Sequence, residues 1–385
     1  MRYSLTASSR RFWAVIALMA VIPAVVPASQ ARALDRGQDD PKSVGAAIES
    51  PRVDAEPRRA DASRARVERI AWLMGTRTTI TVEAADHPTA VAASEAALAA
   101  MARVERRLST WRDDSELARL NRVAPGTVVR PSADVAALLA EIAEWADITQ
   151  GAFHPAVGAL VDAWDLRDEG RFPAEGAIQT ALLATGPHGV HIDPASGAIV
   201  RRDAGAWLDA GAFGKGAALR QARQALRRVG ASAARIDLGG QILLLGRPWS
   251  RITVAHPTHR SQPVADLHLR DVSVATSGQS ERGIEVDGER FGHLLDPRIG
   301  RPAPAWGSVT VVHPDPVAAD VLATALFVLG PEAGLRLATS LDVAAFFLVA
   351  DGDDLSPLSS PDMCTYLPAR PSWQHTKETC TPLFP

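Results

Sequence analysis

Cysteine is scarce in this sequence: its 385 residues include two, Cys364 and Cys380, both near the C-terminus. No histidine-rich motif flanks either residue, so we do not expect a catalytic thiol. In an oxidising compartment the pair would close one loop as a disulfide, and otherwise they would be free thiols on a C-terminal tail. We favour the disulfide, which would require that the protein is exported to an oxidising compartment.

An excess of basic charge is also missing. The formal net charge is −3 at pH 7, with 41 Lys and Arg against 44 Asp and Glu. A chain without a basic surplus is not expected to bind nucleic acid. Its length suffices for one large domain or two medium ones.

The N-terminal apolar run, from Phe12 to about Val26, is too short for a membrane-spanning helix and contains Pro23. Basic residues precede it, and Ala31-Arg32-Ala33 follows as a small-x-small cleavage site. These features predict a signal peptide over 1–33 and a soluble, periplasmic mature protein. The adjacent arginines Arg10 and Arg11 leave both the Sec and the Tat export routes open.

Three further segments are expected after the signal peptide. Residues 34–66 are rich in Arg, Asp, Ala and Pro without apolar periodicity, which predicts a disordered linker. Order should begin near Ile70 within a domain spanning 67–352, and 353–385 should form a tail. Helices and strands mix in the domain without regular βαβ alternation, so we predict an α+β fold with mostly antiparallel strands and packed helices.

Apolar periodicity and turn residues predict the elements of this domain. A strand-like alternation runs over 69–84. Helices are expected over 88–111, 131–151, 214–230 and 315–330, and strands over 234–238, 241–246, 251–256, 265–269, 272–278, 307–313 and 342–352.

A glycine-rich stretch, LDAGAFGKG at Leu208–Gly216, would let backbone amides approach a ligand closely. Lys215 opens a predicted helix there, so its charge and the helix N-terminus would both face an anion. The Walker pattern is absent, because the glycine spacing differs and no Ser or Thr follows the lysine. An ordinary glycine-rich turn is the alternative.

Asp320 and Thr324 lie four residues apart in AADVLATAL, so their side chains share one face of a predicted helix. Both offer the hard oxygen ligands that suit Mg²⁺. The helix is otherwise apolar, and an inward-facing aspartate there is costly unless it is paired or binds a cation. A favourable interaction of Asp320 with the helix start is the alternative, but it does not account for Thr324.

His293 precedes the stretch LLDPRIGRP, in which Asp-Pro, Ile-Gly and Arg-Pro mark a stiff turn. A turn of this kind could fix an imidazole as a proton acceptor, and a simple packed loop is the alternative.

Several other stretches have both a binding and an ordinary interpretation. Thr276 and Ser277 end a strand in VATSGQSERG, where hydroxyls and amides could hold phosphate or sugar, or could form a plain loop. The turn in IDLGGQILLLG could likewise have a binding role or could simply connect two strands. Met74 and Trp111 could lie against a flat ring, although core packing is their default role. His154, in GAFHPAVGALVDAW, is more often structural than a ligand in such a context.

Taken together, eight stretches resemble the FAD:protein FMN transferases (ApbE-type flavin transferases), in which they occur in the same order. The stretches are MGT, LSTWRDDSELARLN, GAFHPAVGALVDAW, LDAGAFGKGAA, IDLGGQILLLG, ATSGQSER, HLLDPRIGRP and ADVLATAL. Each is weak alone, but eight in order are specific. The resemblance runs from about Ile70 to Ala350 and implies a flavin transferase-like core.

The resemblance further implies Mg²⁺-dependent cleavage of FAD, transfer of FMN to a Ser or Thr hydroxyl of an exported or membrane-bound flavoprotein, and release of AMP. It implies His293 as general base, and as metal ligands Asp320, Thr324 and the backbone carbonyl of Ala212. Positions implied to contact FAD, some through backbone, are Met74, Trp111, Ala152, Phe153, His154, Asp209, Lys215 and Leu295.

One departure from the family pattern concerns His154, because the family often has Phe-Asp-Pro where this chain has Phe153-His154-Pro155. A histidine can hydrogen-bond a ring or a phosphate but supplies no fixed negative charge. This departure leaves open a non-catalytic exported flavin-binding accessory protein. An FAD pyrophosphatase that releases FMN and AMP is a second alternative, because water could replace the protein hydroxyl at the same site.

Overall fold

Eight strands form one sheet, and every pair of neighbours in it is antiparallel. This computed structural model describes residues 64–246, 249–279, 283–286, 288–352 and 354–367, all within a compact unit that begins at Ala60. The predicted signal peptide, nearly all of the predicted linker and Cys380 lie outside the described residues. In spatial order the strands are β1 (Ala65–Leu73), β2 (Thr76–Ala84), β6 (Ala233–Leu238), β7 (Gln241–Gly246), β10 (Ser273–Gly278), β15 (Gly307–His313), β16 (Ala344–Asp351) and β17 (Asp354–Ser359).

The stretch over 69–84 is a hairpin, not one continuous strand. Met74 and Gly75 form its two-residue turn, with φ values of 52° and 70°, and Leu73 pairs with Thr76. Two positive φ values in succession are typical of the tight turns that match the twist of antiparallel strands. β1 also begins at Ala65, five residues before the expected start, so the end of the predicted linker belongs to the sheet.

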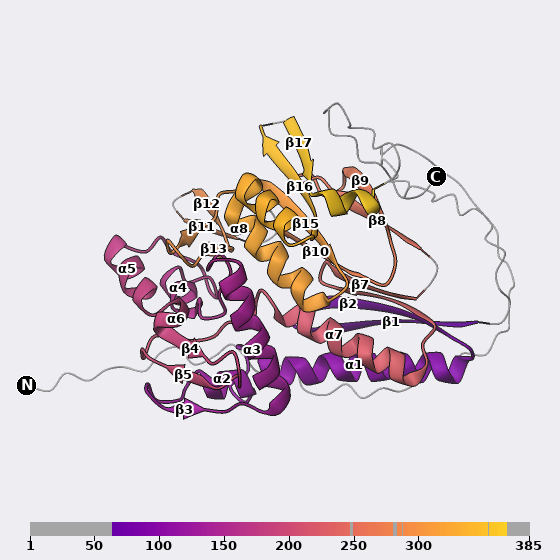
Figure 1. Cartoon of the computed structure of the whole chain (residues 1–385), viewed down its shortest axis with the longest axis horizontal. Helices are drawn as coiled ribbons and strands as arrows, with labels where there is room; N and C mark the ends of the chain where they lie inside the picture. Colours follow the sequence, from indigo (N-terminus) through magenta and orange to yellow (C-terminus); the bar gives the residue numbers. More distant parts are fainter. Residues whose placement is uncertain (1–63, 247–248, 280–282, 287, 353, 368–385) are drawn as a thin grey trace, which may run out of the picture. The chain divides into compact units, whose positions relative to one another are not determined.

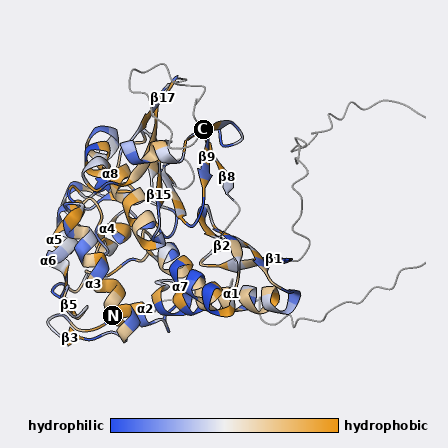
Figure 2. Cartoon of the chain, turned by 45° about the vertical axis from the view of Figure 1, so that its right-hand side comes forward, coloured by the Kyte–Doolittle hydropathy of each residue, from blue (hydrophilic) through white to orange (hydrophobic). Residues whose placement is uncertain are grey.

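Three long helices pack on one face of the sheet (Figure 1). Alternate residues of β7 and β16 face these helices, and the residues between them face the opposite side, so both faces are buried. Figure 2 shows hydrophobic and hydrophilic residues interleaved along α1 and α7, as expected for helices with one buried face. The helices are α1 (His87–Leu108), α7 (Gly214–Val229) and α8 (Pro316–Ser340).

The ends of these helices follow local chemistry. The side chain of Asp86 accepts a hydrogen bond from the Thr89 amide at 2.8 Å and caps α1. Gly230 ends α7 in the left-handed conformation, as expected for a C-terminal glycine. The first part of α8 ends at Gly330 as expected, because the backbone there is non-helical (φ 78°), and a second helical part that begins at Pro331 follows across this kink.

A mostly helical region forms a second core around Trp164 and Phe153, both nearly inaccessible. α3 follows the predicted span, although Ser132 hydrogen-bonds Glu116 instead of capping the helix with its side chain. The elements are α2 (Glu116–Leu120), β3 (Val128–Val129), α3 (Ala133–Ile148), α4 (Gly158–Ala163), α5 (Glu175–Leu183), α6 (Gly186–Gly189), β4 (Val190–Ile192) and β5 (Ile199–Arg201).

The face of the sheet opposite the long helices is covered by a two-stranded ribbon and a short 3₁₀ helix. β17 and this 3₁₀ helix lie within the expected tail, and β17 adds an edge strand that the sequence analysis missed. Cys364, in the 3₁₀ helix, is disulfide-bonded. The remaining elements are β8 (Ser250–Ala255), β9 (Pro263–Leu269), β11 (Gly283–Val286), β12 (Glu289–Gly292), β13 (Leu295–Asp296), β14 (Arg301–Pro302) and η1 (Pro361–Thr365).

Candidate active site

Asp320 is a buried carboxylate where α8 meets the start of α7. It is 4% exposed, and its Oδ2 accepts the Gly216 amide at 2.9 Å. Its Oδ1 lies 3.4 Å from Lys215 Nζ, and the lysine side chain is 34% exposed. The structure therefore brings together an aspartate, a lysine and a helix N-terminus, although 105 residues separate Lys215 from Asp320.

A glycine makes this approach possible. A Cβ added at Gly216 would lie 2.4 Å from the Pro316 carbonyl oxygen and 2.7 Å from Val317 Cα. Any other residue would push the two helices apart, because both neighbouring atoms belong to backbone. Backbone contact is thus what brings the first turn of α7 within hydrogen-bonding distance of Asp320.

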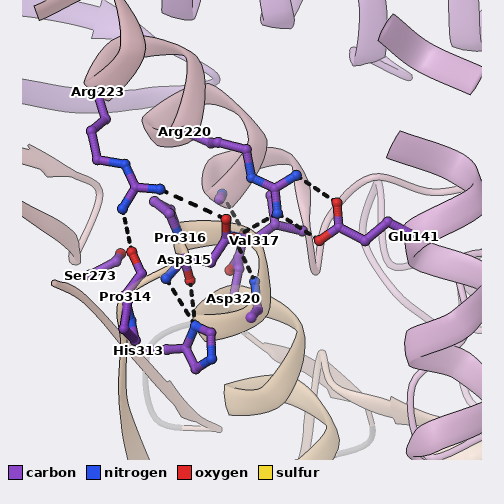
Figure 3. A network of polar contacts seen from close by, with 12 residues as sticks. Glu141, Arg220, Arg223, Ser273, His313, Pro314, Asp315, Pro316, Val317 and Asp320 are labelled. Atoms are coloured by element: carbon purple, nitrogen blue, oxygen red, sulfur yellow. Dashed lines mark hydrogen bonds and ion pairs between the residues drawn. The ribbon is translucent and has the colours of Figure 1, made fainter. Parts of the chain in front are cut away.

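A polar network fixes the N-terminus of α8 (Figure 3). Asp315 caps the helix by accepting the Val317 amide at 2.7 Å. Arg220 of α7 donates to Asp315 and to both oxygens of Glu141 on α3, each at 2.6 Å. Arg223 donates to the Pro314 carbonyl. Three helices are therefore joined one turn before Asp320.

Thr324 and Ala212 complete the implied ligand set. Thr324 follows Asp320 by one turn of α8 and is partly exposed between buried neighbours. Ala212 is partly buried and packs against a core that includes Val317 and Val321 of α8. No three His, Cys, Asp or Glu side chains gather at one point among the described residues. A carboxylate, a hydroxyl and a peptide carbonyl are nevertheless hard oxygen donors, so their chemistry fits Mg²⁺.

Met74 lies over the start of α7. A Cβ built on Gly214 would lie 3.1 Å from Met74 Cε, so this side chain reaches the glycine-rich stretch. The Met74 amide donates to Glu105 Oε1 at 2.9 Å, which ties the β1–β2 turn to α1. The structure thus places Met74 against Gly214, the residue before Lys215.

Asp209 and Trp111 are joined through Arg167, which the sequence analysis did not single out. The guanidinium of Arg167 lies 4.8 Å from the Trp111 ring centroid and 4.3 Å from that of Trp207. It also approaches Asp209 Oδ2 at 3.4 Å and donates to the Thr110 carbonyl at 3.1 Å. Trp111 is 73% exposed, so a cation–π contact orients an indole that still offers surface to a ligand.

The three adjacent positions Ala152, Phe153 and His154 have different surroundings. Ala152 and Phe153 are 1% and 2% exposed, so their side chains face the core and any ligand contact would use their backbone. His154 Nδ1 accepts the Ala156 amide at 3.0 Å. Burial lowers the pKa of His154 to about 4, against the opposing charge of Asp147, so its imidazole is neutral at pH 7.

His293 lies between the β11–β12 and β13–β14 hairpins, and hydrogen bonds hold the turn after it. Asp296 is buried and accepts the Arg298 amide at 2.9 Å and the Arg298 guanidinium at 2.7 Å. The Gly300 carbonyl accepts Trp164 Nε1 at 2.9 Å, which attaches the turn to the helical region. Leu295 is 7% exposed and packs in that region's core.

Contacts among the described residues therefore join the candidate residues in three groups: Lys215 with Asp320, Met74 with the start of α7, and Trp111 with Asp209 through Arg167. Arg167 carried no signal in the sequence, because Trp207, Asp209 and Thr110 are all 40 or more residues away from it. The capping aspartate Asp315 did carry one, in the pattern Asp-Pro at a helix start.

Solved structures of flavin transferases share this fold. The structure of Pseudomonas stutzeri flavinyl transferase ApbE in its apo form matches with a TM-score of 0.69 and 27% identity, covering 78% of this chain and 96% of that one. The structure of the flavin transferase ApbE from Vibrio cholerae matches with a TM-score of 0.70 and 26% identity, covering 79% and 100%.

The sequence comparisons agree with the fold. The "FAD:protein FMN transferase" of Treponema pallidum is 34% identical over 282 residues, which are 68% of this chain and 78% of that protein. A Klebsiella pneumoniae protein of the same name is 34% identical over 280 residues, 71% and 86% of the two chains. The sequence model of the ApbE family matches residues 74–347. The chain belongs to the ApbE family.

Proposed function

We propose that this member of the ApbE family is a Mg²⁺-dependent FAD:protein FMN transferase. The observation that carries the proposal is Asp320, a buried carboxylate that faces Lys215 and the N-terminus of α7. A helix N-terminus with a lysine favours a phosphate, and a nearby carboxylate suits the cation that accompanies a diphosphate. The relatives named FAD:protein FMN transferase support this assignment.

The reaction moves the FMN phosphoryl group from one oxygen to another. The hydroxyl oxygen of a Ser or Thr in the acceptor protein attacks the phosphorus on the FMN side of FAD, and the bond to the AMP phosphate breaks. His293 takes the hydroxyl proton, because an imidazole titrates near neutral pH. General-base help of this kind is typically worth ~10² to 10⁴-fold.

Charge neutralisation is the other requirement of phosphoryl transfer. Asp320, Thr324 and the Ala212 carbonyl would hold Mg²⁺, which supplies positive charge to the diphosphate oxygens. Lys215, beside the N-terminus of α7, would bind the same phosphates from the protein side. Met74, Asp209 and the exposed Trp111 line the approach to them.

The neutral His154 does not argue for a protein without turnover. Its Nδ1 accepts the amide two residues further on, which a carboxylate at this position could also do. The substitution keeps the acceptor and loses the charge, while Lys215, Asp320 and His293 are all present. The absence of a carboxylate at position 154 is therefore no argument for a non-catalytic accessory protein.

The place of action follows from the N-terminus. The predicted signal peptide over 1–33 directs the protein to the periplasm, by Sec or Tat. The acceptor would then be an exported or membrane-bound flavoprotein with a hydroxyl-bearing loop.

Mass spectrometry tests the proposal. The protein is incubated with FAD, Mg²⁺ and exported flavoproteins from the same cell, and the acceptor mass is measured. A covalent FMN adduct supports transfer, whereas free FMN and AMP without an adduct would show a pyrophosphatase. Asp320→Asn should abolish the adduct, and the exposed Asp351→Asn serves as the matched control.

A further inference from the structure

Gln279 is a buried polar residue to which the proposed function gives no role. It directly follows β10, within the stretch ATSGQSER, and it is 5% exposed. A buried amide needs partners for its donors and its acceptor, because unpaired polar groups cost free energy in the interior. Where those partners lie decides what Gln279 does.

Among the described residues, the side chain of Gln279 bonds to backbone atoms of Leu294 and Ala303. Its Oε1 accepts the Leu294 amide at 3.2 Å. Its Nε2 donates to the Ala303 carbonyl at 2.8 Å and to the Leu294 carbonyl at 3.3 Å. One side chain therefore holds both polar groups of the residue after the histidine.

The residue before the histidine is fitted to the same amide. A Cβ built on Gly292 would lie 1.6 Å from Gln279 Oε1 and 1.8 Å from its Cδ. Gly292 thus leaves the space that the amide fills, and Gln279 contacts the chain on both sides of His293. No other residue type offers a donor and an acceptor on a stem of this length.

The residues on either side of His293 belong to two short hairpins. β12 ends at Gly292 and β13 begins at Leu295, so His293 and Leu294 lie between these hairpins. The Ala303 amide donates to the Leu294 carbonyl at 2.8 Å, and Gln279 bonds to that carbonyl as well. The amide of Gln279 is therefore one of the groups that set the direction of the His293 Cα–Cβ bond.

We propose that Gln279 is a positioning residue: its side-chain amide holds the backbone on both sides of His293 and so aims the imidazole at the acceptor hydroxyl. The inference rests on the proposed function, in which His293 is the general base. Misaligning a reacting group by about 1 Å can cost ~100-fold in rate, so the amide matters to turnover and not to FAD binding.

A double-mutant cycle tests this role. Gln279→Met keeps the length of the side chain and removes its hydrogen bonds. We expect kcat for FMN transfer to fall about 10- to 100-fold and the Kd for FAD to change much less, because Leu295 is the one implied FAD contact in this turn and the others lie on other elements. In a His293→Ala background, Gln279→Met should change the rate less than about twofold, because no imidazole remains to be aimed.

Controls separate the possible outcomes. The exposed Gln179→Met on α5 should transfer FMN at the parental rate. Equal slowing by Gln279→Met with and without His293 would overturn the inference, as would a folded Gln279→Met with the parental kcat. If Gln279→Met does not fold, Gln279→Glu runs the same cycle, since it keeps the acceptor for the Leu294 amide and loses both donated bonds. Failure of the parental protein to label any acceptor would instead count against the proposed function.

Discussion

Three histidines in this chain share one local structure, in which proline follows the histidine and Nδ1 accepts the amide of the residue after that. The distances are 3.0 Å from Ala156 to His154, 3.2 Å from Thr258 to His256 and 2.9 Å from Asp315 to His313. Proline has no amide hydrogen, so the next amide is the first donor available. These histidines stabilise turns, whereas His293 is followed by leucine.

Removing the buried imidazole should flatten the pH dependence of stability. The pKa of His154 is about 4 in the folded protein and 6.5 in the unfolded chain, so the unfolded chain binds an extra proton between these values. The free energy of unfolding should therefore fall as the pH drops from 6.5 towards 4. His154→Gln should remove up to about 1.4 kcal/mol per pH unit of that slope.

Urea unfolding at several pH values between 4.5 and 7.5 measures this slope for the parent and for His154→Gln. The exposed His191→Gln is the control and should retain the parental slope. Identical slopes for the parent and His154→Gln would mean that burial does not keep His154 neutral.

The charge of Asp320 should matter to catalysis more than to folding. Asn at position 320 can still accept the Gly216 amide but cannot pair with Lys215 or neutralise a cation. We expect Asp320→Asn to lower the transfer rate at least ~100-fold, in line with loss of a metal's charge stabilisation. The free energy of unfolding should change by less than about 2 kcal/mol. Rates measured over a Mg²⁺ titration, beside urea melts, check both parts.

At the scale of elements, the contact between α7 and α8 depends on the absence of one side chain. Gly216→Ala would place a methyl group against the backbone of α8, 2.4 Å from the Pro316 oxygen. Overpacking of this kind typically costs ~1 to 3 kcal/mol. We also expect a loss of activity larger than the loss of stability explains, because Lys215 and Asp320 would separate.

The matched control is Gly176→Ala on the surface of α5, where an added Cβ meets nothing within 4 Å. That variant should gain roughly 0.5 to 1 kcal/mol, the usual preference of a helix for alanine. Thermal melts of both variants measure the changes in stability, and transfer assays measure the changes in activity. Equal effects of the two substitutions would show that α7 and α8 are not in close backbone contact.

Most elements were predictable from periodicity, but the turn at Met74 and Gly75 was not. In β1 the inward positions are odd-numbered, ending at Leu73, and in β2 they are even-numbered, beginning at Thr76. The sequence hides this change of phase, because Ile70 and Trp72 are apolar yet 59% and 75% exposed, so the apolar alternation continues through the turn. β17 was missed for a different reason: it contains Pro357, which is tolerated in a strand at the edge of a sheet.

The candidate site was predictable only in part. Sequence spacing brings Asp320 and Thr324 onto one face, because four residues make about one helical turn. It does not reveal Arg167 or Gln279, whose partners come from other elements. Contacts of this kind depend on the packing of helices and hairpins, which local pattern does not encode.

At the scale of the whole molecule, the described residues fall within one unit that begins at Ala60, shortly before β1. A chain that starts at Ala60 should therefore fold and transfer FMN as the longer chain does. We expect the Tm to stay within about 2 °C, which corresponds to roughly 1 kcal/mol or less at this size. Differential scanning calorimetry and the transfer assay on both forms check this, and a large fall in Tm would mean that earlier residues stabilise the fold.

The direct backbone contact at Gly216 has a mechanical consequence. Helices separated by side chains can slide as those side chains change rotamer, but main chain against main chain leaves no such layer. α7 and α8 should therefore move as one rigid body. The distance between the Asp320 carboxylate and the Lys215 ammonium should stay the same throughout turnover. A movement that opens the site to a nucleotide would then involve the exposed side chain of Trp111 and the loops around it.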